Sequence, residues 1–111
     1  MTEKEKKWCF DILQAIKNIS AFTVGIDSFD SYNSDLKTQS AVERQLSIIG
    51  EAVNQLRKSE STIKLSHTNE IVGFRNWIVH AYDTIDSTIV WTILQVHLPI
   101  LEAEINDQTT V

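Results

Sequence analysis

The segment Leu36–Lys58, LKTQSAVERQLSIIGEAVNQLRK, decides the fold class. Its apolar residues recur every three or four positions and share one stripe of a helix, namely Val42, Leu46, Ile49, Val53 and Leu56. A stripe of this kind has to be buried against other elements. The segment therefore predicts a long core helix over residues 36–58.

Gly50 interrupts this predicted helix at a cost of about 1 kcal/mol relative to alanine. A glycine in the middle of a helix often marks the place where another backbone passes close by. The alternative is that the helix simply tolerates the glycine. The sequence alone leaves both interpretations open.

The N-terminal segment predicts a second core helix, from about Glu3 to Val24. Its apolar stripe consists of Cys9, Ile12, Leu13, Ile16 and Ile19. Thr2 and Glu5 have the Thr-x-x-Glu spacing of a capping box, and Gly25 is a suitable stop. Residues 26–35 are rich in Ser, Asp and Asn, so we predict a loop between these two helices.

Two further helices complete the chain. Residues 59–66 are polar and predict a connection with some short helix, after which Thr68 can cap a helix that reaches about Tyr82. Asp86 can cap the last helix, whose apolar residues are Ile89, Ile93, Val96, Ile100 and Leu101. Pro99 lacks a backbone donor and should kink that helix near residues 95–98, or end and restart it there.

Four helices with short connections predict an all-α fold, an antiparallel up-and-down four-helix bundle in a single domain over residues 1–111. The 111 residues carry a formal net charge of −5, which argues against general coating of DNA or RNA phosphates but allows a local cationic site. We expect no membrane span, no metal site and no cofactor. The single cysteine, Cys9, predicts a buried thiol and a reducing, cytoplasmic setting.

Polar chemistry is concentrated in Gly73–Asp83, GFRNWIVHAYD. On a helix, Ile71, Phe74, Ile78 and Ile85 would face the core. Arg75 and Tyr82 share a second stripe, whereas His80 lies about 140° around the helix from Arg75. Arg75 and His80 can therefore meet at one phosphate if the helix frays, if the arginine curls around it, or if a second copy faces the first. The last route predicts a two-fold homodimer with a shared cleft.

These residue types suit metal-free RNA cleavage. A histidine can move a proton near neutral pH, and an arginine binds phosphate oxygens bidentately. Arg75 would stabilise the charge of the transition state, and His80 would act on the 2′-OH or on the departing 5′-oxygen. The alternative is that both are ordinary surface residues, and the spacing alone is a weak signal.

Glu51 follows Gly50 inside an apolar run, where an unpaired carboxylate would be costly. We expect Glu51 to meet Arg44 or Arg75, and in the second case to orient the arginine for phosphate. An exposed Glu51 without a partner is the alternative.

Arg75-Asn76-Trp77-Ile78-Val79-His80-Ala81-Tyr82 resembles the Arg-x4-His-x-Tyr motif of HepT-like HEPN toxins, the partners of MntA-type minimal nucleotidyltransferases. The block from Ala41 to Ala52 is similar to the family's second-helix signature, and Tyr82–Asp86 extends the first match. The resemblance covers nearly the whole chain. Trp77 departs from the pattern, because a smaller aliphatic residue is more usual there.

The resemblance implies a HEPN-like fold, a homodimer with its active cleft at the interface, and metal-independent endoribonuclease activity of a toxin. It implies that Arg75 and His80 are catalytic, with Asn76 as a supporting polar residue. It also implies that an MntA-type antitoxin transfers AMP to Tyr82, which would add bulk and negative charge near Arg75. A non-catalytic subunit that binds or presents a nucleotide to the transferase is the alternative, and a plain dimeric scaffold is a third.

Overall fold

The computed structural model describes residues 1–80 and 85–109, and for residues 77–80 it describes the backbone alone. Every regular element in this part of the chain is helical. The elements are α1 (Glu3–Phe22), α2 (Phe29–Asn33), α3 (Leu36–Lys58), α4 (Asn69–His80), α5 (Ser87–Thr92), the π-helical segment η1 (Ile93–His97) and α6 (Leu98–Thr109). The predicted all-α fold is confirmed.

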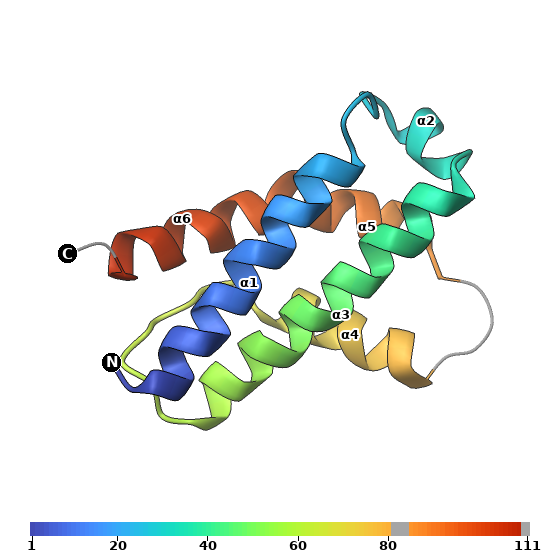
Figure 1. Cartoon of the computed structure of the whole chain (residues 1–111). Coiled ribbons are helices and arrows are strands. Elements are labelled where there is room, and N and C mark those ends of the chain that lie inside the picture. The colour runs from blue at the N-terminus through green and yellow to red at the C-terminus, as the bar shows by residue number, and fades with distance from the viewer. Residues whose placement is uncertain (81–84, 110–111) are drawn as a thin grey trace.

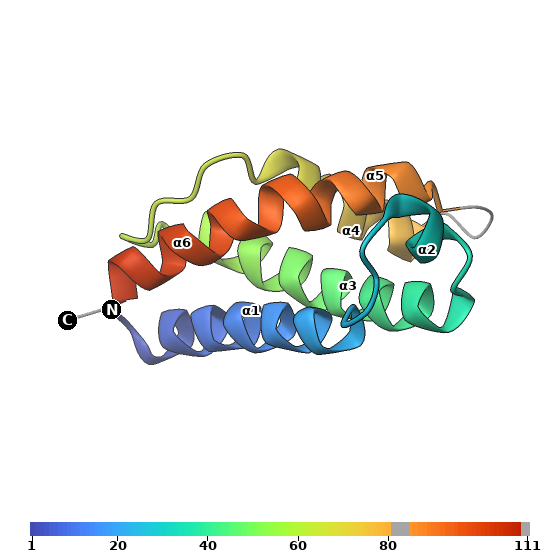
Figure 2. The ribbon, with the colours of Figure 1, turned by 90° about the horizontal axis from the view of Figure 1, so that it is seen from above.

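The long helices form two layers (Figures 1 and 2). Helices α1 and α3 lie side by side and run in opposite directions, while α4 and the continuous stretch α5–η1–α6 cover them from one side. Successive long helices reverse direction, as the up-and-down prediction requires. Helix α3 is central, because it packs against both α1 and α4.

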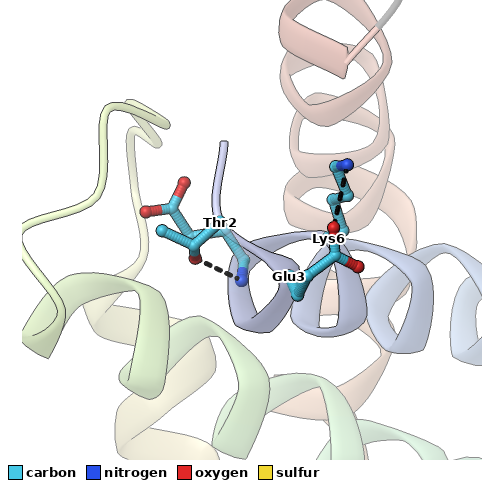
Figure 3. Close-up of polar contacts among 4 residues, drawn as sticks. Thr2, Glu3 and Lys6 are labelled. Carbon is cyan, nitrogen blue, oxygen red and sulfur yellow. Dashed lines mark hydrogen bonds and ion pairs between the residues drawn. The ribbon is translucent and has the colours of Figure 1, made fainter.

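Polar side chains cap the starts of α1, α3 and α5. The Thr2 side chain accepts a hydrogen bond from the Glu5 backbone N–H at 3.1 Å, and Figure 3 shows this bond at the start of α1. Asp35 and Asp86 cap α3 and α5 in the same way. Helix α3 has the predicted bounds, whereas α1 ends at Phe22, two residues before the predicted end.

The core contains the predicted α3 stripe in full, and four of the five predicted α1 residues are buried, with Leu13 partly buried. Ile71 and Phe74 of α4 are buried as predicted, and Ile85 is partly buried. The side chain of Ile78 lies outside the described part. The α1–α3 pair therefore forms one half of the core, and α4 closes it from the second layer.

The loop predicted over residues 26–35 is partly wrong, since it contains the short helix α2. Ser28 caps this helix, and the Gln39 side chain donates to the carbonyls of Tyr32 and Asn33 at its other end. Tyr32 is fully buried and lies 5.8 Å from Trp91, measured between ring centroids. The burial of one aromatic residue thus stabilises a turn of helix that polar composition alone did not predict.

The connection between α3 and α4 has no helix, contrary to the prediction of a short one. Gln108 of α6 bonds the backbone of Lys64 twice, at its N–H and its carbonyl, both at 2.7 Å. Glu104 accepts from the Ser66 N–H and hydroxyl. These distant side chains satisfy the backbone groups that a local helix would have satisfied.

The last helix contains the predicted irregularity. The hydrogen-bond ladder becomes π-helical over Ile93–His97, just before Pro99, whose missing N–H cannot continue an α-helical ladder. The extra residue of a π turn rotates the following residues around the axis. For this reason the predicted apolar stripe is wrong at Val96 and Ile100, which are exposed. Ile89 precedes the π turn and is exposed as well. The residues that face the core are Val90, Ile93, Leu98, Leu101 and Ile105.

Among the described residues, the stretch Ser87–Thr109 is long and apolar enough to cross a membrane by length and composition. Its five core-facing side chains pack into the bundle, and a core helix passes the same test. Its apolar character is therefore explained in part by the fold itself.

Candidate active site

Helices α3 and α4 approach closely at Gly50. A Cβ placed on Gly50 would lie 2.3 Å from Cβ and 2.8 Å from Cγ of Arg75, and 3.3 Å from the carbonyl oxygen of Ile71. No side chain larger than hydrogen fits there without a shift of α4, because the first clash is with an atom bonded to its backbone. Of the two interpretations of Gly50, close approach of another backbone is confirmed.

Arg75 crosses over Gly50 and meets the carboxylate of Glu51. Its Nη2 lies 2.8 Å from Oε2 of Glu51, and its Nη1 donates to Oδ1 of Asn76 at 3.1 Å. The side chains of Arg75 and Glu51 are 27% and 46% exposed, so the pair is accessible from solvent. The predicted contact between Glu51 and Arg75 is confirmed, while Arg44 is an exposed residue of α3.

Gln55 extends this network along α3, and sequence reasoning missed it. Its Nε2 donates to Oε1 of Glu51 at 2.9 Å, so both carboxylate oxygens of Glu51 are engaged. The signal was present in the sequence, since residues four apart on a helix are neighbours. Gln55 fixes the Glu51 carboxylate, which in turn holds the Arg75 guanidinium.

The remaining predicted site residues lie at the end of α4. Asn76 follows Arg75 and is exposed. His80 is the last residue of α4, but its side chain lies outside the described part, as does Tyr82 altogether. The structure therefore brings together Arg75, Asn76 and Glu51, and it leaves the distance from Arg75 to His80 open.

Other reactive groups are separate from this network. Cys9 is buried, and burial together with the nearby Glu5 carboxylate raises the pKa of its thiol, as expected for a packing residue. His67 has a positive φ of 52° in the connection before α4, and the Nδ1 atom of His97 is buried without a hydrogen-bond partner among the described residues. Within the described ranges, no three His, Cys, Asp or Glu side chains gather in a group able to hold a metal ion.

The chemistry available here is that of anion recognition. A guanidinium held by a carboxylate at Nη2 and by an amide at Nη1 is pre-oriented. Its Nε is buried, and each Nη has a second N–H that can bind an anion. The helix that carries this arginine ends with a histidine. Fold and site together define a helical-bundle protein with a solvent-accessible arginine that is held by a carboxylate and an amide.

Comparison with known proteins identifies the family. Residues 12–107 match the family described as Ribonuclease HepT-like, and the chain belongs to this family. A Thermococcus cleftensis protein that is named provisionally as ribonuclease HepT is 32% identical over 108 residues, which cover 94% of each chain. A Methanocaldococcus jannaschii protein named provisionally as an RNase is 31% identical over 104 residues, covering 90% of this chain and 92% of its own. No match to a solved structure is found.

Proposed function

We propose that this protein is a metal-independent endoribonuclease and the toxin of a toxin–antitoxin pair. The observation that carries the proposal is the Arg75 guanidinium, held at 2.8 Å by Glu51 in a chain of the HepT-like ribonuclease family. A fixed guanidinium stabilises charge that develops on a phosphate without reorganising during the reaction. The ion pair also keeps the arginine extended across α3 rather than free in solvent.

The reaction is an internal transesterification. A base takes the proton of the ribose 2′-OH, and that oxygen attacks the adjacent phosphorus. The bond from phosphorus to the 5′-oxygen breaks, an acid protonates that oxygen, and a 2′,3′-cyclic phosphate remains. His80 transfers protons, Arg75 binds the phosphate oxygens, and Asn76 supports the arginine.

A homodimer would supply two sets of these groups to one cleft. On an ideal straight helix, positions 75 and 80 lie about 140° apart, so a second subunit would help to bring both groups to one phosphate. Exposed apolar residues on the last helix, Ile89, Val96 and Ile100, offer surface for association. We propose that two copies form the active cleft at their interface, in the cytoplasm.

Regulation would act on Tyr82, through an MntA-type nucleotidyltransferase antitoxin. The Tyr82 oxygen attacks the α-phosphorus of ATP, and pyrophosphate leaves. The resulting AMP ester would place a negative charge two residues after His80 and repel an RNA phosphate. Incubation with ATP and the antitoxin should add the mass of AMP to wild type but not to Tyr82→Phe.

Two observations favour a second candidate, a non-catalytic subunit that presents a nucleotide to the transferase. The chain has a net charge of −5, and its site arginine is already paired with a carboxylate. The test is cleavage of RNA by the purified chain, with Arg75→Ala and His80→Ala as controls and with added chelator. Cleavage that both variants abolish and the chelator spares supports the ribonuclease. An inactive wild type supports the second candidate, and loss of activity in chelator contradicts the metal-free mechanism.

A further inference from the structure

A groove runs between α1 and α3 and reaches the carboxylate that holds Arg75. Its volume is about 300 Å³, at the lower end of the range for small-molecule sites. Glu51 belongs both to this groove and to the ion pair with Arg75. A molecule in the groove would therefore lie next to a phosphate bound at Arg75. The lining residues are Lys7, Trp8, Asp11, Ile48, Glu51, Ala52 and Gln55.

The charge of the lining disfavours a phosphate in the groove. Asp11 and Glu51 contribute two carboxylates and Lys7 contributes one ammonium. Lys7 is bound to Asp11, with Nζ 2.9 Å from Oδ2. An anionic group would meet net negative charge, so the occupant that fits is neutral and rich in hydrogen-bond donors.

Of the two carboxylates in the groove, Asp11 has an available acceptor oxygen. Both oxygens of Glu51 are engaged, by Arg75 and by Gln55. Asp11 uses Oδ2 for Lys7, and its Oδ1 makes no hydrogen bond to another described residue. A carboxylate is matched by two adjacent N–H groups, and the guanine edge with its N1–H and 2-amino group provides them. Trp8 adds the aromatic surface on which RNA-binding proteins stack an unpaired base.

We propose that this groove binds a guanine base of the RNA substrate, next to the phosphate that Arg75 holds. Asp11 accepts from the guanine edge, and Trp8 contacts the ring. The proposal deepens the ribonuclease function proposed above and rests on it for the identity of the ligand as part of an RNA. It assigns base preference to α1, a helix that carries no residue of the Arg75 network.

Binding tests the groove without any cleavage. Guanosine, inosine and adenosine are titrated separately into the unmodified chain by isothermal calorimetry. Inosine keeps N1–H and lacks the 2-amino group, and adenosine presents an acceptor at N1. We expect guanosine to bind about 10-fold more tightly than either, as for a bidentate base contact. Asp11→Ala should remove this difference, whereas Asp27→Ala, an exposed carboxylate between α1 and α2, should keep it. Equal binding of the three nucleosides overturns the proposal.

Cleavage-site sequencing gives the second measurement. On a pool of random RNA, wild type should cut with guanine enriched at one position beside the broken bond. Asp11→Ala should lose this enrichment, and circular dichroism should show an intact fold, whereas Asp27→Ala should keep both the enrichment and the wild-type cleavage rate. If wild type cuts RNA without base preference and binds no guanosine, the proposed guanine site is wrong and the ribonuclease proposal stands. If wild type binds guanosine through Asp11 but never cleaves RNA, the ribonuclease proposal is wrong and the guanine site stands.

Discussion

The two flanks of α3 differ in how tightly they are packed. Against α4, the approach at Gly50 is so close that a Cβ would lie 2.3 Å from that of Arg75. Against α1, apolar side chains such as Ile12 and Leu46 fill the inner side, while the outer side leaves a groove of about 300 Å³. The tight flank sets the position of an arginine, and the open flank has room for a ligand. One helix can thus hold a charged group rigidly and still offer a binding surface beside it.

The largest effect should come from Arg75→Lys. Lysine keeps the positive charge but cannot bind a carboxylate and a phosphate through a planar fork. We expect RNA cleavage to fall about 100-fold or more, measured as the initial rate on a labelled RNA. Cleavage near the wild-type rate would mean that charge alone suffices and that the geometry of the tight flank has no catalytic importance.

Gly50→Ala tests the close approach itself. The added Cβ must displace α4, so we expect a loss of about 1–3 kcal/mol in the free energy of unfolding, measured in urea. Gly73→Ala is the matched control on α4, because a Cβ there has nothing within 4 Å. That variant should gain about 0.5–1 kcal/mol from helix propensity. If both variants gained stability, the two helices would not be in contact at Gly50.

Glu51→Gln tests whether Glu51 orients the Arg75 guanidinium or only stabilises the fold. The pair is partly exposed, so its loss should cost less than about 1 kcal/mol in the free energy of unfolding. The guanidinium would lose its anionic anchor, and we expect cleavage to fall about 10-fold because the phosphate-binding geometry loosens. Arg44→Gln removes an exposed charge from the same helix and should leave the rate close to wild type. Unchanged cleavage by a stable Glu51→Gln protein would show that Glu51 is not a positioning residue.

The smallest effect should come from Asp35, which caps the start of α3, the helix that lies between the two flanks. Hydrogen bonds from the backbone and side chain of Thr38 lower the pKa of Asp35 below its usual value of 3.8. The cap therefore contributes stability above that value, and the contribution is lost as the pH falls through the lower pKa of the folded state. Asp35→Asn keeps an acceptor but does not titrate. Its melting temperature should fall less than that of wild type between pH 5 and pH 3. Parallel curves for the two proteins would contradict this role.

Much of the fold follows from local patterns. The apolar stripe predicts α3 with its observed bounds, and Pro99 predicts a disturbance where the π-helical segment lies. Local patterns gave wrong predictions for residues 26–35 and 59–66, where side chains distant in the sequence determine the structure. Trp91 and the burial of Tyr32 stabilise α2, and Gln108 binds the backbone of Lys64. Trp91 and Gln108 lie more than 40 positions from the segments they stabilise, so no local sequence window contains them.

For the candidate site, the sequence led to the contact of Glu51 with an arginine but not to Gln55 or to the full geometry. Helical spacing and the cost of an unpaired carboxylate led to Glu51 and offered two arginines as partners. Only the packing of α4 on Gly50 selects Arg75 over Arg44. The groove beside Trp8 was not foreseen, because its two walls come from helices more than 30 positions apart in the sequence.

The hydrogen bonds from α6 to the connection before α4 also bear on the order in which the chain folds during synthesis. Lys64 and Ser66 are bound by side chains 44 and 38 positions later in the chain. During translation, α1, α3 and the Arg75 segment are all synthesised before residues 104 and 108 exist to hold that connection. The connection that leads into α4 therefore gains these hydrogen bonds only late in synthesis. A nascent chain stalled before residue 104 would carry every proposed catalytic residue and still lack this restraint.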